Sequence, residues 1–417
     1  MFRKLVLLGL IVFLGWIAII PLSSLGKFKD YTLIFVGLLC IISILSYKSK
    51  KALILDKYDL PFWLFLVGMI PAVFFAQADK WVAYKRFLDF VIPSVILYFL
   101  LKSGFRPEFG APISRMTCLF ASIIALLGLS ELVFHRNFIY EYLVNNPYYS
   151  EYIHWPRIMS TKLHPAVLGS FLVGCLPFSL YLIKIYKSKI SRVLAAISMV
   201  LIFLGILFSL TRGSIIAAIV ALVIYLCLKK SRLVKKFIFA VIIVYLIFLI
   251  ASTSIQNPQI KRLGWQGLVG WFHYRGVRFS TTFKMFKDHP FFGVGLNNYR
   301  PLFDKYHVSK CVAYEFKIPD NMYLMILGET GLLGFSLFLV FIFFLLKGAF
   351  KTMPLIRDDS LKEFLLVTMA ALIGILVNMF TYELFYWTEP MYQFWILVGL
   401  IVAITQEVRY ARDIKTN

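Results

Sequence analysis

An arginine stands where this apolar sequence should rarely tolerate charge. Arg212 lies in the segment FSLTRGSIIAA, at the junction of two long apolar runs. A guanidinium at membrane depth costs roughly a few kcal/mol unless it reaches the surface or a polar partner. Two interpretations stay open: Arg212 snorkels from a tight turn, or its planar guanidinium binds an anionic group, such as a phosphate, at the membrane surface.

A second cluster carries two arginines three residues apart. The segment HYRGVRFSTTFKMFKDHPFFGVGLNNY contains Arg275 and Arg278, which would share one face of a helix. Three aromatic residues would form an apolar stripe suited to the membrane surface: Phe279, Phe283 and Phe286. The arginines are therefore either solvated charges of an interfacial helix or groups that bind a substrate anion. The HPFFGVG segment that follows indicates a helix end and a turn.

A third cluster combines two carboxylates and an amide. In KIPDNMYLMILGETGLLGF, Asp320 and Asn321 stand at the entry of an apolar run, and Glu329 lies inside it. Asp and Asn are favoured as helix caps, and capping does not exclude catalysis by Asp320 or a substrate contact by Asn321. A carboxylate inside the membrane usually faces a cavity or a cation. We favour pairing of Glu329 with Arg212 over direct contact with a substrate.

A weaker cluster precedes another apolar run. The segment HWPRIMSTKLHPAVLGSF contains Arg157 and His164. Such loop residues are either solvated and in contact with lipid headgroups, or they contact the substrate.

Membrane-spanning helices must position these clusters. Of the 417 residues, 60% are hydrophobic and 16% are charged, a composition that excludes an ordinary soluble domain and a disordered chain. The sequence predicts an all-α polytopic membrane protein, a single integral membrane domain over residues 1–417 with about twelve spans. The first run is expected to be a retained helix, because no small-residue cleavage site follows it. The predicted spans are 5–25, 31–47, 60–76, 87–101, 116–134, 165–183, 193–210, 213–228, 237–253, 322–346, 364–382 and 391–406.

The basic residues predict the orientation. With the N-terminus in the cytoplasm, 25 of the 44 lysines and arginines fall in inside segments and 6 in short outside segments. This distribution follows the positive-inside rule and places both termini in the cytoplasm. The remaining 13 lie in two long outer loops, 135–164 and 254–321, which also hold all six histidines. We expect the second loop, between the ninth and tenth helices, to be partly helical and to carry catalytic elements.

The same distribution explains the net charge of +23 without a nucleic-acid partner. Most of this charge faces the anionic inner leaflet, so membrane lipids are the expected contacts. Cys311 is the one cysteine outside the apolar runs, which supports neither a disulfide framework nor a zinc site. Neither a P-loop, a GxSxG elbow nor an HExxH motif is present, and we expect no metal and no cofactor.

Together these segments resemble the O-antigen ligase and polymerase superfamily of bacterial membrane glycosyltransferases. The matching pieces are SLTRG at 209–213, the stretch from Arg275 to Tyr299, PDNMYLMILGETGLLGF at 319–335 and, more weakly, RIMSTKLHPAVLG at 157–169. The resemblance implies an enzyme of the bacterial inner membrane with a periplasmic active site. It implies a donor glycan on undecaprenyl pyrophosphate, an acceptor that is a glycan or lipid A core, and a chain-length regulator as a further partner.

In ligases of this superfamily, the arginines that match Arg212 and Arg275 bind the donor pyrophosphate, and a histidine before the asparagine activates the acceptor. Here Asp320 stands in place of that histidine. A carboxylate can act as the base if burial raises its pKa. The substitution favours an O-antigen or exopolysaccharide polymerase, with an O-antigen ligase as the alternative. A lipid-linked oligosaccharide flippase is a further alternative, although its key charges would be expected along a central cavity.

Overall fold

The structure is a computed structural model of the chain. It describes residues 2–20, 37–38, 59–137, 157–232, 236, 243, 265–307 and 317–416. The regular structure in these ranges is helical, and no strand occurs in them. Apart from residues 37, 38 and 243, the predicted spans 31–47 and 237–253 lie outside the described residues.

Among the described residues, seven helices are long and apolar enough to cross a membrane. They are α5 (Lys80–Gly104), α6 (Gly110–Phe134), α8 (Pro165–Ile185), α9 (Lys189–Phe208), α15 (Met322–Thr352), α16 (Asp359–Asn378) and α17 (Thr388–Thr416). Shorter apolar helices occupy three further predicted spans: α1 (Phe2–Ile19), the pair α3 (Leu60–Gly68) and α4 (Ile70–Phe74), and α10 (Arg212–Leu228). The prediction of an all-α polytopic membrane protein is therefore confirmed.

Several predicted boundaries differ from the structure: α17 ends at Thr416 instead of residue 406, and α6 begins at Gly110 instead of residue 116. Helix α5 begins at Lys80, seven residues before the apolar run predicted from residue 87. Its cap is Asp79, whose side chain accepts hydrogen bonds from the backbone N–H groups of Trp81 and Val82 at 2.8 and 3.0 Å. Capping extends the helix into a polar segment that hydropathy alone does not include.

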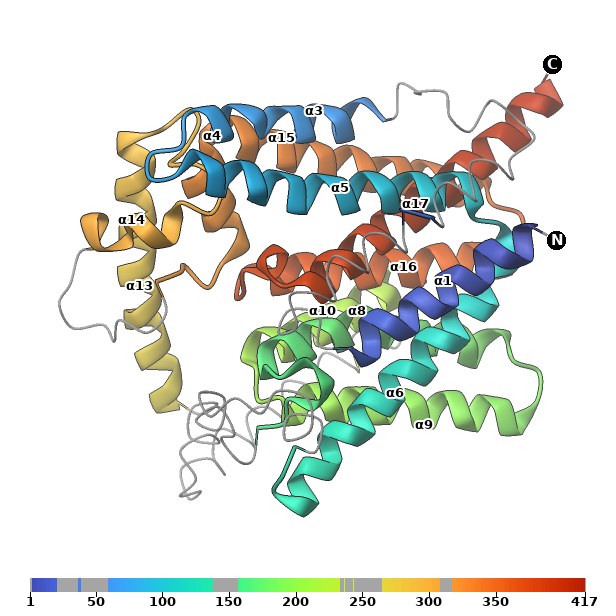
Figure 1. The fold of residues 1–417 in the computed structure, drawn as a ribbon. Helices are drawn as coiled ribbons and strands as arrows, with labels where there is room; N and C mark the ends of the chain where they lie inside the picture. The colour runs from blue at the N-terminus through green and yellow to red at the C-terminus, as the bar shows by residue number, and fades with distance from the viewer. Residues whose placement is uncertain are drawn as a thin grey trace.

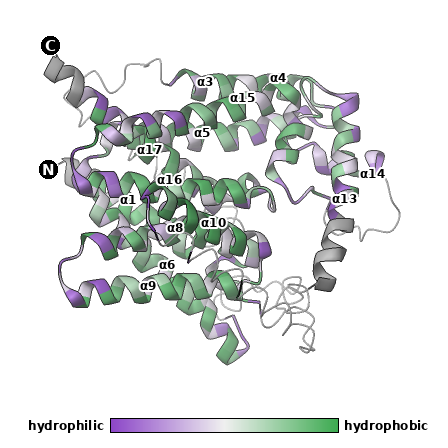
Figure 2. Ribbon diagram, turned by 180° about the vertical axis from the view of Figure 1, so that it is seen from behind, coloured by the Kyte–Doolittle hydropathy of each residue, from purple (hydrophilic) through white to green (hydrophobic). Residues whose placement is uncertain are grey.

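The long helices lie side by side, and the two ends of the bundle differ (Figure 1). Helix α1 begins and α17 ends at one end, while α13 (Trp265–Asp288) and α14 (Tyr299–Tyr306) lie at the other, with α13 running across the bundle (Figure 1). Figure 2 shows hydrophobic residues along the bundle and more hydrophilic ones at its ends and on α14. Helices α8, α16 and α17 form its most buried part. We refer to the two ends as the terminal end and the α13 end.

Helix α15 is interrupted at Gly331, whose φ of 63° and ψ of −163° are not helical. The segment 290–295 packs into this break. The backbone N–H groups of Val294 and Gly295 donate to the carbonyls of Gly328 and Glu329 at 2.9 and 3.0 Å. In return, the N–H of Leu332 donates to the carbonyl of Pro290 at 2.8 Å. Backbone groups freed inside a membrane helix need such partners, because lipid offers none.

Glycine is required on both sides of this contact. A Cβ atom on Gly293 would lie 2.4 Å from the backbone carbon of Glu329, and one on Gly331 would lie 2.4 Å from that of Phe291. Both residues also have positive φ, which glycine adopts most easily. The predicted turn after α13 is thus present, and its role is to fix the end of α13 against α15.

Candidate active site

A turn between α16 and α17, residues 379–387, organises the α13 end of the bundle. The carbonyl oxygens of Phe380 and Thr381 accept hydrogen bonds from the two terminal nitrogens of Arg275, at 2.9 and 2.8 Å. The carbonyl of Met379 accepts from the N–H of Met322, the first residue of α15, at 2.7 Å. The turn therefore joins α13 to the start of α15.

Helix α13 turns its two arginines inward and Phe283 outward, while Phe279 and Phe286 are half-buried. Arg275 is 7% exposed and Arg278 is fully buried, whereas Phe283 is 52% exposed. The prediction that the two arginines share a face is confirmed. The interpretation of both as solvated charges is wrong, because tertiary contacts with the turn and with Asp320 bury this face.

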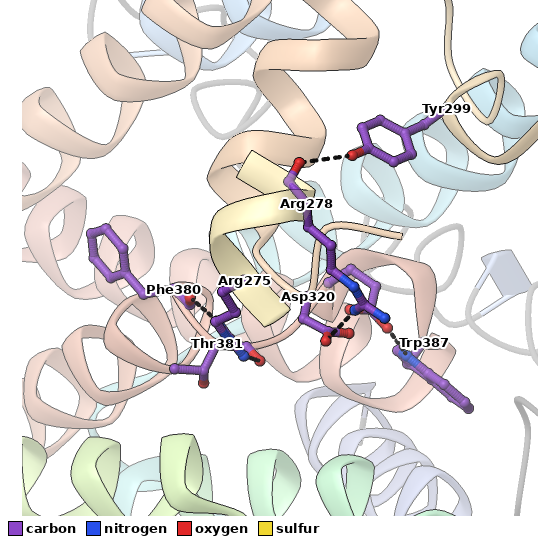
Figure 3. Close-up of polar contacts among 8 residues, drawn as sticks. Arg275, Arg278, Tyr299, Asp320, Phe380, Thr381 and Trp387 are labelled. Atoms are coloured by element: carbon purple, nitrogen blue, oxygen red, sulfur yellow. Dashed lines mark hydrogen bonds and ion pairs between the residues drawn. The ribbon is translucent and has the colours of Figure 1, made fainter. Parts of the chain in front are cut away.

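Asp320 and Arg278 form an ion pair at the entry of α15 (Figure 3). The side chain of Arg278 is 1% exposed, whereas the side chain of Asp320 is 26% exposed. Burial raises the pKa of Asp320, and the nearby Arg278 and Arg275 oppose that rise. The same burial lowers the pKa of both arginines. Asp320 is thus the member of the pair that a substrate can reach.

Asn321, rather than Asp320, caps α15. Its side-chain oxygen accepts a hydrogen bond from the N–H of Leu324 at 3.0 Å. Asp320 instead has a positive φ of 46°, a conformation that Asp tolerates better than most residues. The capping interpretation of Asp320 is therefore wrong, and its side chain faces Arg278. Asn321 is 5% exposed, and its role is to stabilise the start of α15.

Arg212 begins α10 beside the same turn. The next residue, Gly213, packs so closely on Thr381 that a Cβ atom would lie 1.7 Å from the Thr381 Oγ1 atom. Thr381 in turn holds Arg275. Arg212 is half-buried at the first position of the helix. Its place at a helix N-terminus adds the partial positive charge of the helix dipole.

The end of the first long loop reaches this turn as well. The Nδ1 atom of His164 lies 3.3 Å from the Tyr382 hydroxyl, and its ring stacks on Trp387 with centroids 4.9 Å apart. Burial, and then Arg157, lower the pKa of His164 to about 3, so its ring is neutral. Arg157 donates to the carbonyl of Ser209 at 3.2 Å. Both residues thus have protein partners, which corrects the interpretation of them as simply solvated.

Glu329 has a different environment from the predicted one. It is 3% exposed and accepts a hydrogen bond from the Tyr386 hydroxyl. The cation near it is Arg86, which stacks on the Tyr386 ring at 4.1 Å and donates to the carbonyl of Phe385 at 2.6 Å. The predicted partner, Arg212, is instead beside Thr381. Glu329 therefore stabilises the turn through its hydrogen bond with Tyr386.

Sequence reasoning missed the turn itself. Its segment, TYELFYW at 381–387, begins at the end of the predicted span 364–382 and continues beyond it. Glu383 is 3% exposed, accepts from the Trp387 ring N–H at 3.4 Å, and interacts electrostatically with Asp320 and Arg278. A carboxylate among aromatic residues between two apolar runs was the available signal.

These features define a class: a polytopic helical membrane protein with a charged site of arginines and a reachable carboxylate at one end of its bundle. Such a site suits an anionic substrate and a hydroxyl nucleophile. Residues 197–339 match the family model described as O-antigen ligase. This match spans about a third of the chain and confirms, over that part, the resemblance to the O-antigen ligase and polymerase superfamily. It includes Arg212, Arg275, Arg278 and Asp320. None of the curated proteins matches the chain.

Proposed function

We propose that the protein is a glycosyltransferase of the periplasmic face of the inner membrane, which moves a glycan from undecaprenyl pyrophosphate to an acceptor hydroxyl. The observation that carries this proposal is the convergence of the site. Arg275 and the residue after Arg212 meet at Thr381, and Asp320 is paired with Arg278 one helical turn from Arg275. Cations and a carboxylate are thus adjacent, as transfer from a pyrophosphate to a hydroxyl requires.

In the proposed reaction, Asp320 accepts the proton of the acceptor hydroxyl. The acceptor oxygen forms a bond to the anomeric carbon while the bond from that carbon to the phosphate oxygen breaks. The electron pair leaves with undecaprenyl pyrophosphate, and attack from the opposite side inverts the anomeric configuration. The partly exposed Arg212 binds the departing pyrophosphate directly, and the buried Arg275 adds charge beneath it.

A polymerase is the favoured member of the family. Asp320 replaces the histidine implied for ligases, and its raised pKa suits a carboxyl base. Acceptor and donor would both be lipid-linked repeat units, and a chain-length regulator is a proposed partner. The partly exposed carboxylate of Asp320 and the arginines near it at the α13 end also favour an enzyme over a flippase.

Product analysis tests the proposal. Purified protein is incubated with one undecaprenyl-pyrophosphate-linked repeat unit from its host, with and without a lipid A core acceptor, and products are resolved by size. A ladder from the repeat unit alone is the expected result. Product formed only with the core would identify a ligase. No covalent product in either reaction, with the substrate verified, would contradict the enzyme and favour the flippase.

A further inference from the structure

Glu383 is a second carboxyl group beside Asp320. It lies two residues after Thr381, in the turn that holds Arg275. Its Oε1 atom accepts from the Trp387 ring N–H at 3.4 Å, while its buried Oε2 atom has no protein hydrogen-bond partner. Figure 3 draws Trp387 close to the Arg278–Asp320 pair. A buried carboxylate oxygen without a donor is costly, whereas a protonated carboxyl avoids most of that cost.

The surrounding charges do not offset a second anion. Arg278 is bonded to Asp320, and Arg275 is bonded to two carbonyls of the turn. The titratable and charged groups that face Glu383 come from α13, from the entry of α15 and from its own turn. They are Arg275, Arg278, Asp320 and Tyr382. Two close carboxylates in a poorly solvated site cannot easily ionise together.

We infer that Glu383 is a positioning residue that forms with Asp320 a carboxyl pair holding one proton, in which Asp320 is ionised and Glu383 is neutral. This inference rests on the proposed function and deepens it. Asp320 is the ionised member because it has the Arg278 contact and the greater exposure. The neutral Glu383 leaves the two arginines in excess over one carboxylate, so the site is positive when the donor pyrophosphate arrives.

The pair gives the site an upper pH limit. Burial and then the neighbouring Asp320 raise the pKa of Glu383 well above the usual glutamate range. Above that pKa, Glu383 ionises, competes with Asp320 for Arg278 and cancels the positive charge that attracts the donor. The charge of a pyrophosphate diester does not change in this range. The KM for the donor should therefore rise as the pH passes the pKa of Glu383, by at most about tenfold for each pH unit.

The matched test uses Glu383→Gln. Glutamine keeps an oxygen for the Trp387 ring N–H but cannot ionise. We expect the variant to lose the alkaline rise of its KM for the donor. Trp387→Phe removes the donor that favours the ionised form, so it should move the rise to higher pH. The control is Glu389→Gln, a buried glutamate on α17 that lies near Lys162, and its profile should match the wild type.

Infrared difference spectra test the pair without turnover. A protonated carboxyl has a C=O stretch that a carboxylate lacks, so spectra between mildly acidic and mildly alkaline pH reveal buried carboxyls that titrate. The wild type and Glu389→Gln should show a band that Glu383→Gln lacks. The same band in Glu383→Gln, or an unchanged alkaline rise of its KM, would overturn the inference. The expected band in a protein that makes no product would uphold the pair and contradict the proposed function.

Discussion

The two ends of the helical bundle bury charge in different ways. At the terminal end, Asp59 pairs with Lys102 and accepts from the Tyr98 hydroxyl, and Glu363 meets Lys229 at 3.0 Å and accepts from Tyr225. Each of these two carboxylates contacts a cation and a tyrosine hydroxyl. At the α13 end, two arginines, two carboxyls and the adjacent Arg212 gather around one turn.

The two ends differ in whether their buried charged groups can be reached from outside the protein. We interpret the inaccessible pairs as contacts between helices and the accessible carboxylate as a group that can contact a substrate. In the Lys102–Asp59 pair, the two side chains are 0% and 1% exposed, so neither can meet a ligand. In the Arg278–Asp320 pair, the carboxylate is 26% exposed and its cation is buried behind it. We therefore expect substitutions at the terminal end to affect stability, and those at the α13 end to affect transfer.

The largest effect is expected from the arginines at the turn. Arg212→Ala and Arg275→Ala should each abolish transfer while the protein remains inserted in the membrane, because the leaving pyrophosphate loses its cations. Product ladders and membrane fractionation measure the two results. Arg275→Lys is the matched control for charge alone. It should remain strongly impaired, since an ammonium group cannot contact both turn carbonyls as the planar fork does. Full activity of both alanine variants would sink the proposed mechanism.

The next effect concerns the base. Asp320→Asn should lower kcat by about 10²–10⁴-fold, the usual contribution of a general base. In the wild type, the base must be ionised, so kcat should rise with pH through the pKa of Asp320. That pKa lies above the ordinary aspartate value because of burial, and the rise should disappear in the variant. The pH–rate profile measures both. A rise that persists in Asp320→Asn would assign the base to another group.

The reverse result is expected at the terminal end. Asp59→Ala leaves Lys102 buried without its carboxylate and should destabilise the protein by about 3–5 kcal/mol. Transfer per folded molecule should stay unchanged. Thermal unfolding in detergent measures the first quantity and the rate normalised to folded protein the second. Adding Lys102→Met should recover most of the stability. If the single variant loses transfer while remaining folded, the division between the two ends is wrong.

The smallest effect is expected from the glycines near α13. Gly293→Ala forces a side chain against the backbone of Glu329 and should cost roughly 1–3 kcal/mol, with a lower kcat because α13 shifts. Gly276→Ala is the control, since a Cβ atom there meets nothing within 4 Å. It should be neutral or stabilise by up to about 1 kcal/mol. Equal unfolding temperatures for the two variants would contradict the proposed anchoring of α13.

Local patterns in the sequence predict much of this architecture. Apolar runs predict the spans, and the three-residue spacing of Arg275 and Arg278 predicts their common face. Contacts between distant segments could not be predicted in the same way. Arg275 lies 105 residues before Phe380, and no local pattern indicates that hydrogen bond. The prediction that Glu329 pairs with Arg212 was wrong for the same reason, because the cation near Glu329 is Arg86, which belongs to α5.

The turn between α16 and α17 also determines when the site can exist. Arg275 leaves the ribosome 105 residues before Phe380, an interval on the order of 5–20 s at ordinary synthesis rates. During this interval the chain does not yet contain the two carbonyls that accept hydrogen bonds from Arg275. The site is completed only when the last two helices, α16 and α17, have inserted, so a chain that is still being synthesised has no assembled site.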